Sequence, residues 1–402
     1  MDEVKTAPVL FLEKKDCCAC GACVNACSKD AISMKEDEYG FLYPFIDADK
    51  CVKCGKCKTV CAYQNVKENN KPLKTWAAVS SSEKIVMHSA SGGVFSTLAA
   101  AFLKSKEYVS GAVFDDGFNL HHIITDNMKD LIKLQGSKYT QSNTGDVFRQ
   151  IREKLKNGNN VLFCGCPCQV AGLRAYLGKE YDNLFTLDLI CHGVPSNRMF
   201  KDYLKCYENQ KDIKTKRFLF RDKKLGWGIN GKLITQDNKN KKILSSSSSY
   251  LYYFLHGLLY RNNCYNCKYS CHNRPGDITI GDYWGVEKEH PDYLGAAKID
   301  ESKGVSVIIA NTCKGLRLIE EHSALFNLYE STFEKAARGN AQLNSPTKYD
   351  HKREEILDVY ADGGWEAVEM KFNKEIGLKR YSGYIKSLIP QKLKRTLKRY
   401  LK

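Results

Sequence analysis

Eight cysteines near the N-terminus repeat one spacing twice. The pattern C-x2-C-x2-C-x3-C occurs at Cys17, Cys20, Cys23 and Cys27, and again at Cys51, Cys54, Cys57 and Cys61. Four thiolates hold one 4Fe-4S cluster, and in doubled runs of this type the fourth cysteine of each run binds the other cluster. The spacing therefore predicts two clusters, the first bound by Cys17, Cys20, Cys23 and Cys61 and the second by Cys51, Cys54, Cys57 and Cys27. The chemistry of such a pair is one-electron transfer.

Residues 1–66 resemble the bacterial two-cluster ferredoxins in this doubled run. Ser28 and Ala62 stand where the ferredoxin pattern has proline, which leaves ligation intact but alters the surroundings of the clusters. Zinc is the alternative metal, although zinc sites favour paired C-x2-C segments over runs of four cysteines. Cys18, which adjoins a predicted ligand, is interpreted as a bystander.

A second set of seven cysteines occurs in three later segments. They are Cys164, Cys166 and Cys168, then Cys191, then Cys264, Cys267 and Cys271. A buried strand over 161–164 leads into a helix, so Cys168 is expected at a helix N-terminus, which stabilises thiolates and anionic clusters. Cys191 ends another buried strand, where ligands bind in open α/β sheets. The set predicts a third 4Fe-4S cluster. A redox-active Cys166–Cys168 pair, a zinc site that uses Cys264 and Cys267, and buried inert thiols are the alternatives.

Five motifs in the same region resemble the coenzyme F420 hydrogenase/dehydrogenase beta-subunit family. They are Ser89-Ala-Ser-Gly-Gly-Val94, Gly136-Ser-Lys-Tyr139, Cys166-Pro-Cys-Gln-Val-Ala-Gly-Leu173, Asp188-Leu-Ile-Cys-His-Gly-Val-Pro195 and Asp277-Ile-Thr-Ile-Gly-Asp-Tyr-Trp-Gly285. The resemblance covers roughly residues 75–325 and implies a flavoprotein with FAD and one 4Fe-4S cluster. The cysteines that match the family's ligands are Cys168, Cys191, Cys264 and Cys267. Cys166 replaces a threonine that is common in the family, and Cys271 is an extra cysteine, so either could replace one of the four.

Candidate flavin contacts are fewer. Ser91, Gly92 and Gly93 open a predicted helix, whose first backbone N–H groups could hold a pyrophosphate. Lys138 is a candidate for stabilising the anionic reduced flavin, and a solvated lysine is the alternative. His192 is expected to donate a hydrogen bond to cluster sulfur rather than to move protons. Arg274, Asp282 and Trp284 are expected to shape the site, and no catalytic acid or base is assigned.

The fold class predicted is an α+β ferredoxin-like module followed by an α/β flavoprotein domain. The predicted domains are residues 1–66, then 75–345 after a polar linker over 67–74, and a helical region over 346–402. Strands are expected at 76–79, 111–114, 122–125, 160–164, 184–190, 217–220, 232–235, 277–280 and 305–310, and helices at 94–103, 145–156 and 169–177.

The formal net charge of +16 is concentrated at the C-terminus. Residues 371–402 hold eleven Lys and Arg against one acid, so the rest of the chain is close to balanced and a nucleic-acid surface is not supported. Leu393, Leu397 and Leu401 alternate with basic residues, which predicts an amphipathic tail that contacts a partner or lies peripherally on the inner face of a membrane.

The start of the chain lacks the features of a signal peptide, so we expect a cytoplasmic protein in which clustered cysteines are metal ligands rather than disulfides.

Together these features predict an FAD-dependent iron–sulfur oxidoreductase. A soluble carrier, either reduced deazaflavin coenzyme F420 or ferredoxin, would exchange electrons with the clusters and FAD, and the acceptor is not identified. The alternative is an electron-transfer subunit that has no substrate of its own and feeds a catalytic partner.

Overall fold

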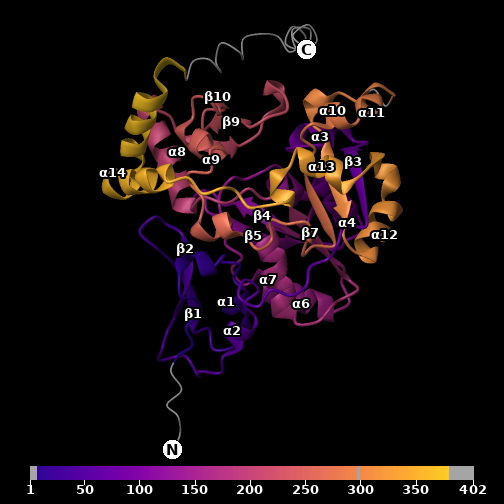
Figure 1. The fold of residues 1–402 in the computed structure, drawn as a ribbon, viewed down its shortest axis with the longest axis horizontal. Coiled ribbons are helices and arrows are strands. Elements are labelled where there is room, and N and C mark those ends of the chain that lie inside the picture. Colours follow the sequence, from indigo (N-terminus) through magenta and orange to yellow (C-terminus); the bar gives the residue numbers. More distant parts are fainter. Residues whose placement is uncertain (1–6, 297–298, 380–402) are drawn as a thin grey trace, which may run out of the picture.

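A computed structural model describes residues 7–296 and 299–379. Figure 1 shows three parts: a small N-terminal module in indigo at the lower left, a large sheet with its helices on the right, and a smaller sheet covered by helices at the upper left. The basic tail predicted from Leu393, Leu397 and Leu401 lies outside the described residues, so its membrane or partner contact stays a prediction. Within the part described, none of the helices combines the length and the apolar character needed to cross a bilayer.

An eight-stranded mixed sheet forms the centre of the molecule. Its order is β13-β3-β12-β11-β7-β6-β4-β5, and the four strands β11, β7, β6 and β4 run parallel to one another. The strands are β3 (Lys74–Ser80), β4 (Tyr108–Phe114), β5 (Leu120–Thr125), β6 (Val161–Gly165), β7 (Leu184–Leu189), β11 (Ile278–Asp282), β12 (Ser306–Ala310) and β13 (Phe326–Ser331). The carboxyl ends of the parallel strands meet at one edge, as expected for a ligand-binding edge.

Helices cover both faces of this sheet because its strands are apolar on both sides. All five residues of β6 are buried, and alternate residues face opposite cores. Leu162 packs with helices α4 and α12, whereas Val161 and Phe163 pack with α6 and α7. These four helices are α4 (Val94–Lys104), α6 (Val147–Lys156), α7 (Pro167–Leu177) and α12 (Cys313–Glu321). Five shorter helices complete the body: α3 (Glu83–His88), α5 (Leu131–Leu134), α10 (Val286–Glu289), α11 (Pro291–Ala296) and α13 (Phe333–Arg338). Residues of α10, α11 and α13 pack against β3 and β12.

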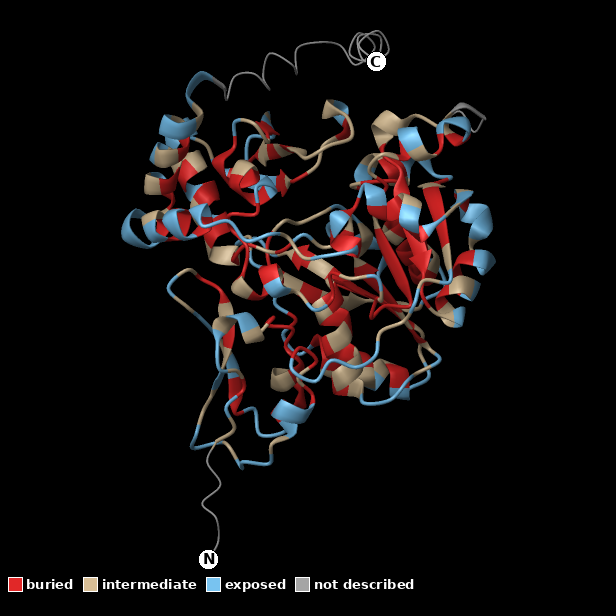
Figure 2. Cartoon of the chain, viewed as in Figure 1, coloured by how far each residue is buried: buried red, intermediate tan, exposed pale blue. Residues whose placement is uncertain are grey.

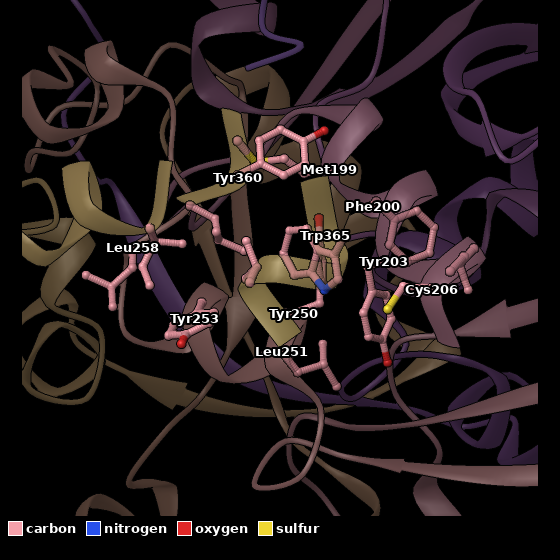
Figure 3. Packing of buried hydrophobic residues seen from close by; sticks show 14 of the residues in the cluster. Met199, Phe200, Tyr203, Cys206, Tyr250, Leu251, Tyr253, Leu258, Tyr360 and Trp365 are labelled. Carbon is pink, nitrogen blue, oxygen red and sulfur yellow. The ribbon is translucent and has the colours of Figure 1, made fainter. Parts of the chain in front are cut away.

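A three-stranded antiparallel sheet, β10-β9-β8, forms the second body. Its strands are β8 (Thr215–Leu219), β9 (Asn230–Thr235) and β10 (Asn240–Leu244), and it packs with α8 (Asn197–Lys211), α9 (Ser249–Leu255) and α14 (Lys352–Ile376). Their shared core is rich in aromatic rings, among them Phe200, Tyr250 and Trp365 (Figure 3). Backbone angles at Gly363 and Gly364 break α14, and Trp365 follows this break and is fully buried.

The N-terminal module consists of an antiparallel pair, β1 (Ile32–Glu36) and β2 (Leu42–Ile46), and two short helices, α1 (Ala22–Ala26) and α2 (Lys56–Thr59). Arg149 of α6 joins it to the body, because its guanidinium donates to the carbonyls of Val24, Asn25 and Cys27 and pairs with Asp30 at 2.7 Å. These carbonyls lie at the C-terminal end of α1, where a cation is favourable. Figure 2 shows buried residues where the module meets the body and exposed residues along its lower rim.

Most elements expected in the body agree with the structure within a few residues, including the strands over 160–164 and 184–190 and the helix over 169–177. The structure adds β1, β2, β10, β13 and α8, which the sequence analysis did not predict, although α8 shows an apolar helical period at Met199, Phe200, Tyr203 and Leu204. The predicted linker over 67–74 is partly paired, since Asn70 forms a β-bridge with Arg274. The helix α14 packs into the aromatic core of the smaller sheet, so part of the predicted 346–402 region is integrated into the body.

One ion pair lies at the centre of the large sheet. Arg274 is 1% exposed and Asp188 is not exposed, and their guanidinium and carboxylate approach to 2.7 Å. Asp188 also accepts hydrogen bonds from the backbone N–H of Gly276 and from the hydroxyl of Thr279. Asp188 is the next-to-last residue of β7, and Cys191 follows three positions later, so this pair fixes the segment that carries Cys191.

We expect Arg274→Met to lower the free energy of unfolding by about 3–5 kcal/mol, because the change leaves the Asp188 carboxylate buried without its cation. Denaturant unfolding followed by circular dichroism measures the effect. Arg217→Met, at an exposed position of β8, is the control and should change stability little. Equal effects of the two substitutions would contradict the role given to the buried pair.

Candidate functional site

Six cysteine side chains from four segments line one small cavity of about 30 Å³. They are Cys18, Cys166, Cys168, Cys191, Cys264 and Cys267. The set contains all four cysteines predicted for the third cluster, together with Cys166, which was named as an alternative ligand. Cys18 is an addition. Cys271 does not line the cavity, and its thiol donates to the carbonyl of Asn273 at 3.1 Å.

The folding of each segment explains this convergence. Cys166 is the N-cap of α7 and Pro167 is its first residue, so the chain turns sharply after β6 and places Cys168 in the first helical turn. Cys191 lies two residues after β7, at the same edge of the sheet. Cys264 lies within the short 3₁₀ helix Asn262–Asn266, and Cys267 is its C-cap.

Burial strongly affects these thiols. Contact with Cys18 lowers the pKa of Cys168, but burial and the neighbouring thiols raise it to about 12. Burial also raises the pKa of Cys264 far above its usual range. The sulfur atoms of Cys166 and Cys191 are 3.8 Å apart, and this contact raises the pKa of Cys166 and lowers that of Cys191. Metal ligation requires thiolates, so binding of iron would displace protons from this site.

The structure also groups the cysteines of the N-terminal module. Burial raises the pKa of Cys23, and the nearby thiols of Cys17, Cys20 and Cys61 raise it further. Burial raises the pKa of Cys57, which is close to Cys54 and Cys27. Each run thus has the fourth cysteine of the other run beside it, as the crossed assignment requires. Among the described residues, no three Cys, His, Asp or Glu side chains converge tightly enough to hold a single metal ion. A four-iron cluster is larger than one ion and needs thiols that stand farther apart.

A second, much larger cavity of about 590 Å³ lies along the carboxyl ends of the parallel strands. It adjoins the cysteine cavity, because Cys166, Cys191, His192, Gly193 and Val194 line both. A cavity of this volume is in the range that accommodates organic cofactors.

The predicted Ser91–Gly93 segment lies at this larger cavity, with different roles for its three residues. Ser91 and Gly93 line the cavity, whereas Gly92 does not, since its Cα packs against the carbonyl of Ala78 and the backbone of Ser306. Gly93 has a φ of 91° and is the N-cap of α4 without a capping side chain. The first N–H groups of α4 are therefore free of intrahelical partners beside the cavity. The Ser91 hydroxyl donates to the carbonyl of Val305 at 2.7 Å and is already used.

Lys138 and His122 also line the larger cavity. The ammonium of Lys138 donates to the carbonyls of Lys133, Leu134 and Gln135, and burial lowers the pKa of Lys138 to about 7. One nitrogen of His122, Nε2, lies 3.2 Å from the carbonyl of Cys164, and the other, Nδ1, is buried without a partner. Burial lowers the pKa of His122 to about 4, so this imidazole is neutral at pH 7.

Asp282 organises the rim of the larger cavity. It accepts hydrogen bonds from Arg221 at 2.8 Å and from the indole N–H of Trp227 at 2.6 Å. Trp227 stacks on Trp284 with ring centroids 4.7 Å apart. Asp282 and Trp284 thus shape the site, as expected from the sequence. Arg274 does not line either cavity and instead pairs with Asp188. His192 lines both cavities, and burial lowers its pKa.

Sequence reasoning missed several residues of this site. His122 lies in an apolar strand, and Arg221 and Trp227 lie in a segment without clear periodicity, so neither the spacing nor the composition marks them. Cys18 carried one signal, a cysteine directly adjoining a predicted ligand, which was interpreted as a bystander. It is buried and lines the six-cysteine cavity, and whether it binds a cluster stays a prediction.

Matches to protein-family models identify the chain as an iron–sulfur electron-transfer protein. Residues 16–65 match the 4Fe-4S dicluster domain, residues 75–149 match the N-terminal domain of the coenzyme F420 hydrogenase/dehydrogenase beta subunit, and residues 158–334 match its C-terminal domain. The last two matches together span more than half of the chain. The chain therefore belongs to the coenzyme F420 hydrogenase/dehydrogenase beta-subunit family and carries an N-terminal dicluster domain.

Among solved structures, the chain is similar to a chain of the F420-reducing NiFe hydrogenase complex from Methanosarcina barkeri. The identity is 16%, the TM-score is 0.42, and the match covers 76% of this chain and 93% of the other. No curated protein matches the chain.

We expect Gly172→Ala to destabilise the contact between the two modules. A methyl group at Gly172 of α7 would lie 2.8 Å from both Cβ and Sγ of Cys20, so Cys20 must move. Overpacking of this kind lowers the free energy of unfolding by about 1–3 kcal/mol. Thermal unfolding measures this, and Gly228→Ala is the control because the closest atom to its new methyl group would be 3.9 Å away. A Gly172→Ala protein as stable as the control would contradict the close contact.

Proposed function

We propose that this protein is an FAD-dependent iron–sulfur oxidoreductase. In this proposal Cys168, Cys191, Cys264 and Cys267 hold a third 4Fe-4S cluster, the larger cavity holds FAD, and electrons pass between a soluble carrier and an acceptor through FAD and three clusters. FAD would supply the conversion between two-electron and one-electron transfer, which clusters alone do not perform.

The common wall of the two cavities is the observation that carries this proposal. A cofactor in the larger cavity would lie beside Cys191, itself a candidate ligand in the smaller one. Cys18, which lines the smaller cavity but not the larger one, belongs to the same loop as Cys17 and Cys20 of the N-terminal module. A flavin, a third cluster and the N-terminal clusters would therefore lie next to one another in that order.

Several polar groups around the larger cavity fit a flavin dinucleotide. The uncapped first turn of α4 offers N–H groups to a pyrophosphate, and the favourable end of the helix dipole adds to them. The unpartnered Nδ1 of His122 is an acceptor for an N–H or O–H group of the ligand. A negative charge on the reduced isoalloxazine would favour the protonated form of Lys138, whose pKa burial lowers to about 7. Ser91 would act through its backbone, since its hydroxyl is already bonded.

We expect anaerobically reconstituted protein to contain about twelve irons and one flavin per chain, the number that three four-iron clusters require. Cys168→Ala and Cys264→Ala should each lower the iron content by about four while the signals of the N-terminal clusters remain. Iron, sulfide and flavin analysis with electron paramagnetic resonance measures these contents.

Two other cysteines provide matched controls. Cys206, buried in the aromatic core, and Cys313, exposed at the start of α12, do not line either cavity, so their alanine variants should keep full iron content. Fewer than about eight irons in the loaded wild-type protein would contradict even the dicluster assignment. A loaded protein that contains about twelve irons but no flavin would support the three cluster sites and contradict the FAD site.

The second candidate is an electron-transfer subunit that feeds a catalytic partner. The family description as a beta subunit favours it. An activity assay of the purified protein distinguishes the enzyme from the electron-transfer subunit. The assay supplies reduced coenzyme F420, reduced ferredoxin or a reduced nicotinamide as the donor and a dye as the acceptor. Turnover by the chain alone supports the enzyme, and cluster reduction without turnover until a partner is added supports the subunit.

The exposed segment around Cys54 is the proposed exit toward a soluble carrier. Cys54 is exposed, and Val52, two residues earlier, is 60% exposed. Four exposed lysines surround them in the sequence: Lys50, Lys53, Lys56 and Lys58. Lys50 pairs with Asp47 at 3.3 Å, and the other three form no ion pair among the described residues. A basic ring around an exposed cluster edge suits an acidic one-electron carrier such as a ferredoxin.

We expect the double change Lys53→Glu and Lys56→Glu to weaken binding of an acidic ferredoxin on the order of tenfold at low ionic strength, because it reverses two charges in the exposed segment around Cys54. Calorimetry gives the dissociation constant, and stopped-flow reduction gives the association rate at two salt concentrations. Lys104→Glu and Lys156→Glu, exposed on α4 and α6 of the body, serve as the control pair with the same change in net charge. Equal loss of binding in both pairs would show that net charge alone matters.

A further inference from the structure

The thiol of Cys18 lies where the two modules meet. Its side chain is 4% exposed and lines the six-cysteine cavity, although the residue belongs to the N-terminal loop. It interacts with the thiol of Cys168 and with that of Cys20. One small side chain therefore touches a candidate ligand of the third cluster and a candidate ligand of an N-terminal cluster.

Arg261 approaches the same junction from the body. It has no exposed surface, and it lines the six-cysteine cavity. Its Nε donates to the carbonyl of Cys17 at 2.9 Å, and its guanidinium lies 4.0 Å above the ring of Tyr43. One guanidinium nitrogen, Nη2, is buried without any hydrogen-bond partner. A cation so deeply buried with a donor unused is costly unless negative charge forms nearby.

Gln141 ties these two residues together. Its side-chain N–H donates to the carbonyl of Cys18 at 3.2 Å, and its side-chain oxygen accepts from Arg261 at 3.3 Å. The Cys17–Cys18 peptide is thus held from both sides by groups of the body, Arg261 on one carbonyl and Gln141 on the next.

We propose that Cys18 and Arg261 form the electron-transfer junction between the N-terminal cluster bound by Cys17 and Cys20 and the third cluster bound by Cys168 and Cys264. The proposal rests on the proposed function in one respect, since it requires a cluster at each of these cysteine sets.

Each residue has a distinct physical role at the junction. The thiol of Cys18 shortens the gap between the two ligand sets and provides a hydrogen bond to ligand sulfur, which raises a cluster's reduction potential. Arg261 places a fixed positive charge in a buried region, where it donates to the carbonyl of Cys17 and lines the cavity that Cys264 also lines. Such a charge favours the reduced, more negative form of either cluster. One electron moves from the reduced to the oxidised cluster, and no bond forms or breaks.

The test uses the reconstituted full-length protein and three variants, Arg261→Met, Arg261→Lys and Cys18→Ala. We expect Arg261→Met to lower the midpoint potentials of the third cluster and the adjoining N-terminal cluster, each by at least a tenfold change in the one-electron equilibrium, about 59 mV. Arg261→Lys keeps the charge and should recover part of the shift. Cys18→Ala should slow electron transfer from dithionite-reduced N-terminal clusters to the flavin at least tenfold, with iron content unchanged.

Arg353 provides the matched control. It is 2% exposed and its Nε donates to the carbonyl of Tyr260 at 2.8 Å, next to Arg261 in the chain, but its guanidinium pairs with Glu354 rather than with the cysteine segments. Arg353→Met should therefore leave the potentials unchanged. Redox titration with electron paramagnetic resonance gives the potentials, and iron analysis shows whether each variant is loaded.

The outcomes separate the junction from the proposed function. Loaded variants with wild-type potentials and wild-type electron transfer would overturn the junction while the cluster and flavin sites stand. Loss of about four irons in Cys18→Ala would make Cys18 a ligand and would also overturn the role given to it here. Wild-type protein that holds only two clusters would overturn the third cluster and the junction together. If Arg261→Met does not fold, Arg261→Lys and Cys18→Ala decide the question.

Discussion

The close packing of the N-terminal loop on helix α7 is the constraint on which the rest of the site depends. Cys20 lies so near Gly172 that no side chain fits between them, and Thr144 and Arg149 hold the same loop from α6 and the segment before it. Electron transfer between centres in different modules needs short, fixed distances. Here hydrogen bonds from side chains of the body to carbonyls of the N-terminal module, together with steric contact, fix the two modules relative to each other.

A buried charge network complements this contact. Asp188 and Arg274 secure the end of β7, and Arg261 lies unexposed beside the cysteine cavity with one nitrogen unpaired. A buried ion pair adds little stability compared with apolar residues of similar volume, although the loss of one partner is costly. The Asp188–Arg274 pair holds the end of β7 near Cys191, and the negative charge of ligated clusters would compensate the unpaired nitrogen of Arg261.

Much of this arrangement could be predicted from the sequence. The doubled cysteine spacing predicted the dicluster module, and strand periodicity located β6 and β7, which carry Cys166 and Cys191 to one edge of the sheet. The cysteine count predicted that Cys264 and Cys267 join that edge, but the choice of four ligands among seven cysteines came from a resemblance, because no local pattern relates segments so far apart in the chain. His122, Arg221 and Arg261 could not be found at all, since their roles arise from burial and from contacts made across modules. Gly92 illustrates the reverse case, because a residue expected to face a ligand packs against β3 and β12 instead.

The aromatic core shared by three parts of the chain has a consequence for the N-terminal module. Phe41 and Tyr43 of its hairpin belong to the same core as Phe200, Tyr250 and Trp365. The module is therefore not a carrier that swings on a tether between partners, and separating it would expose those rings to water. Its clusters would stay in fixed positions. A soluble electron carrier would therefore have to bind at the surface of the module to exchange electrons with them.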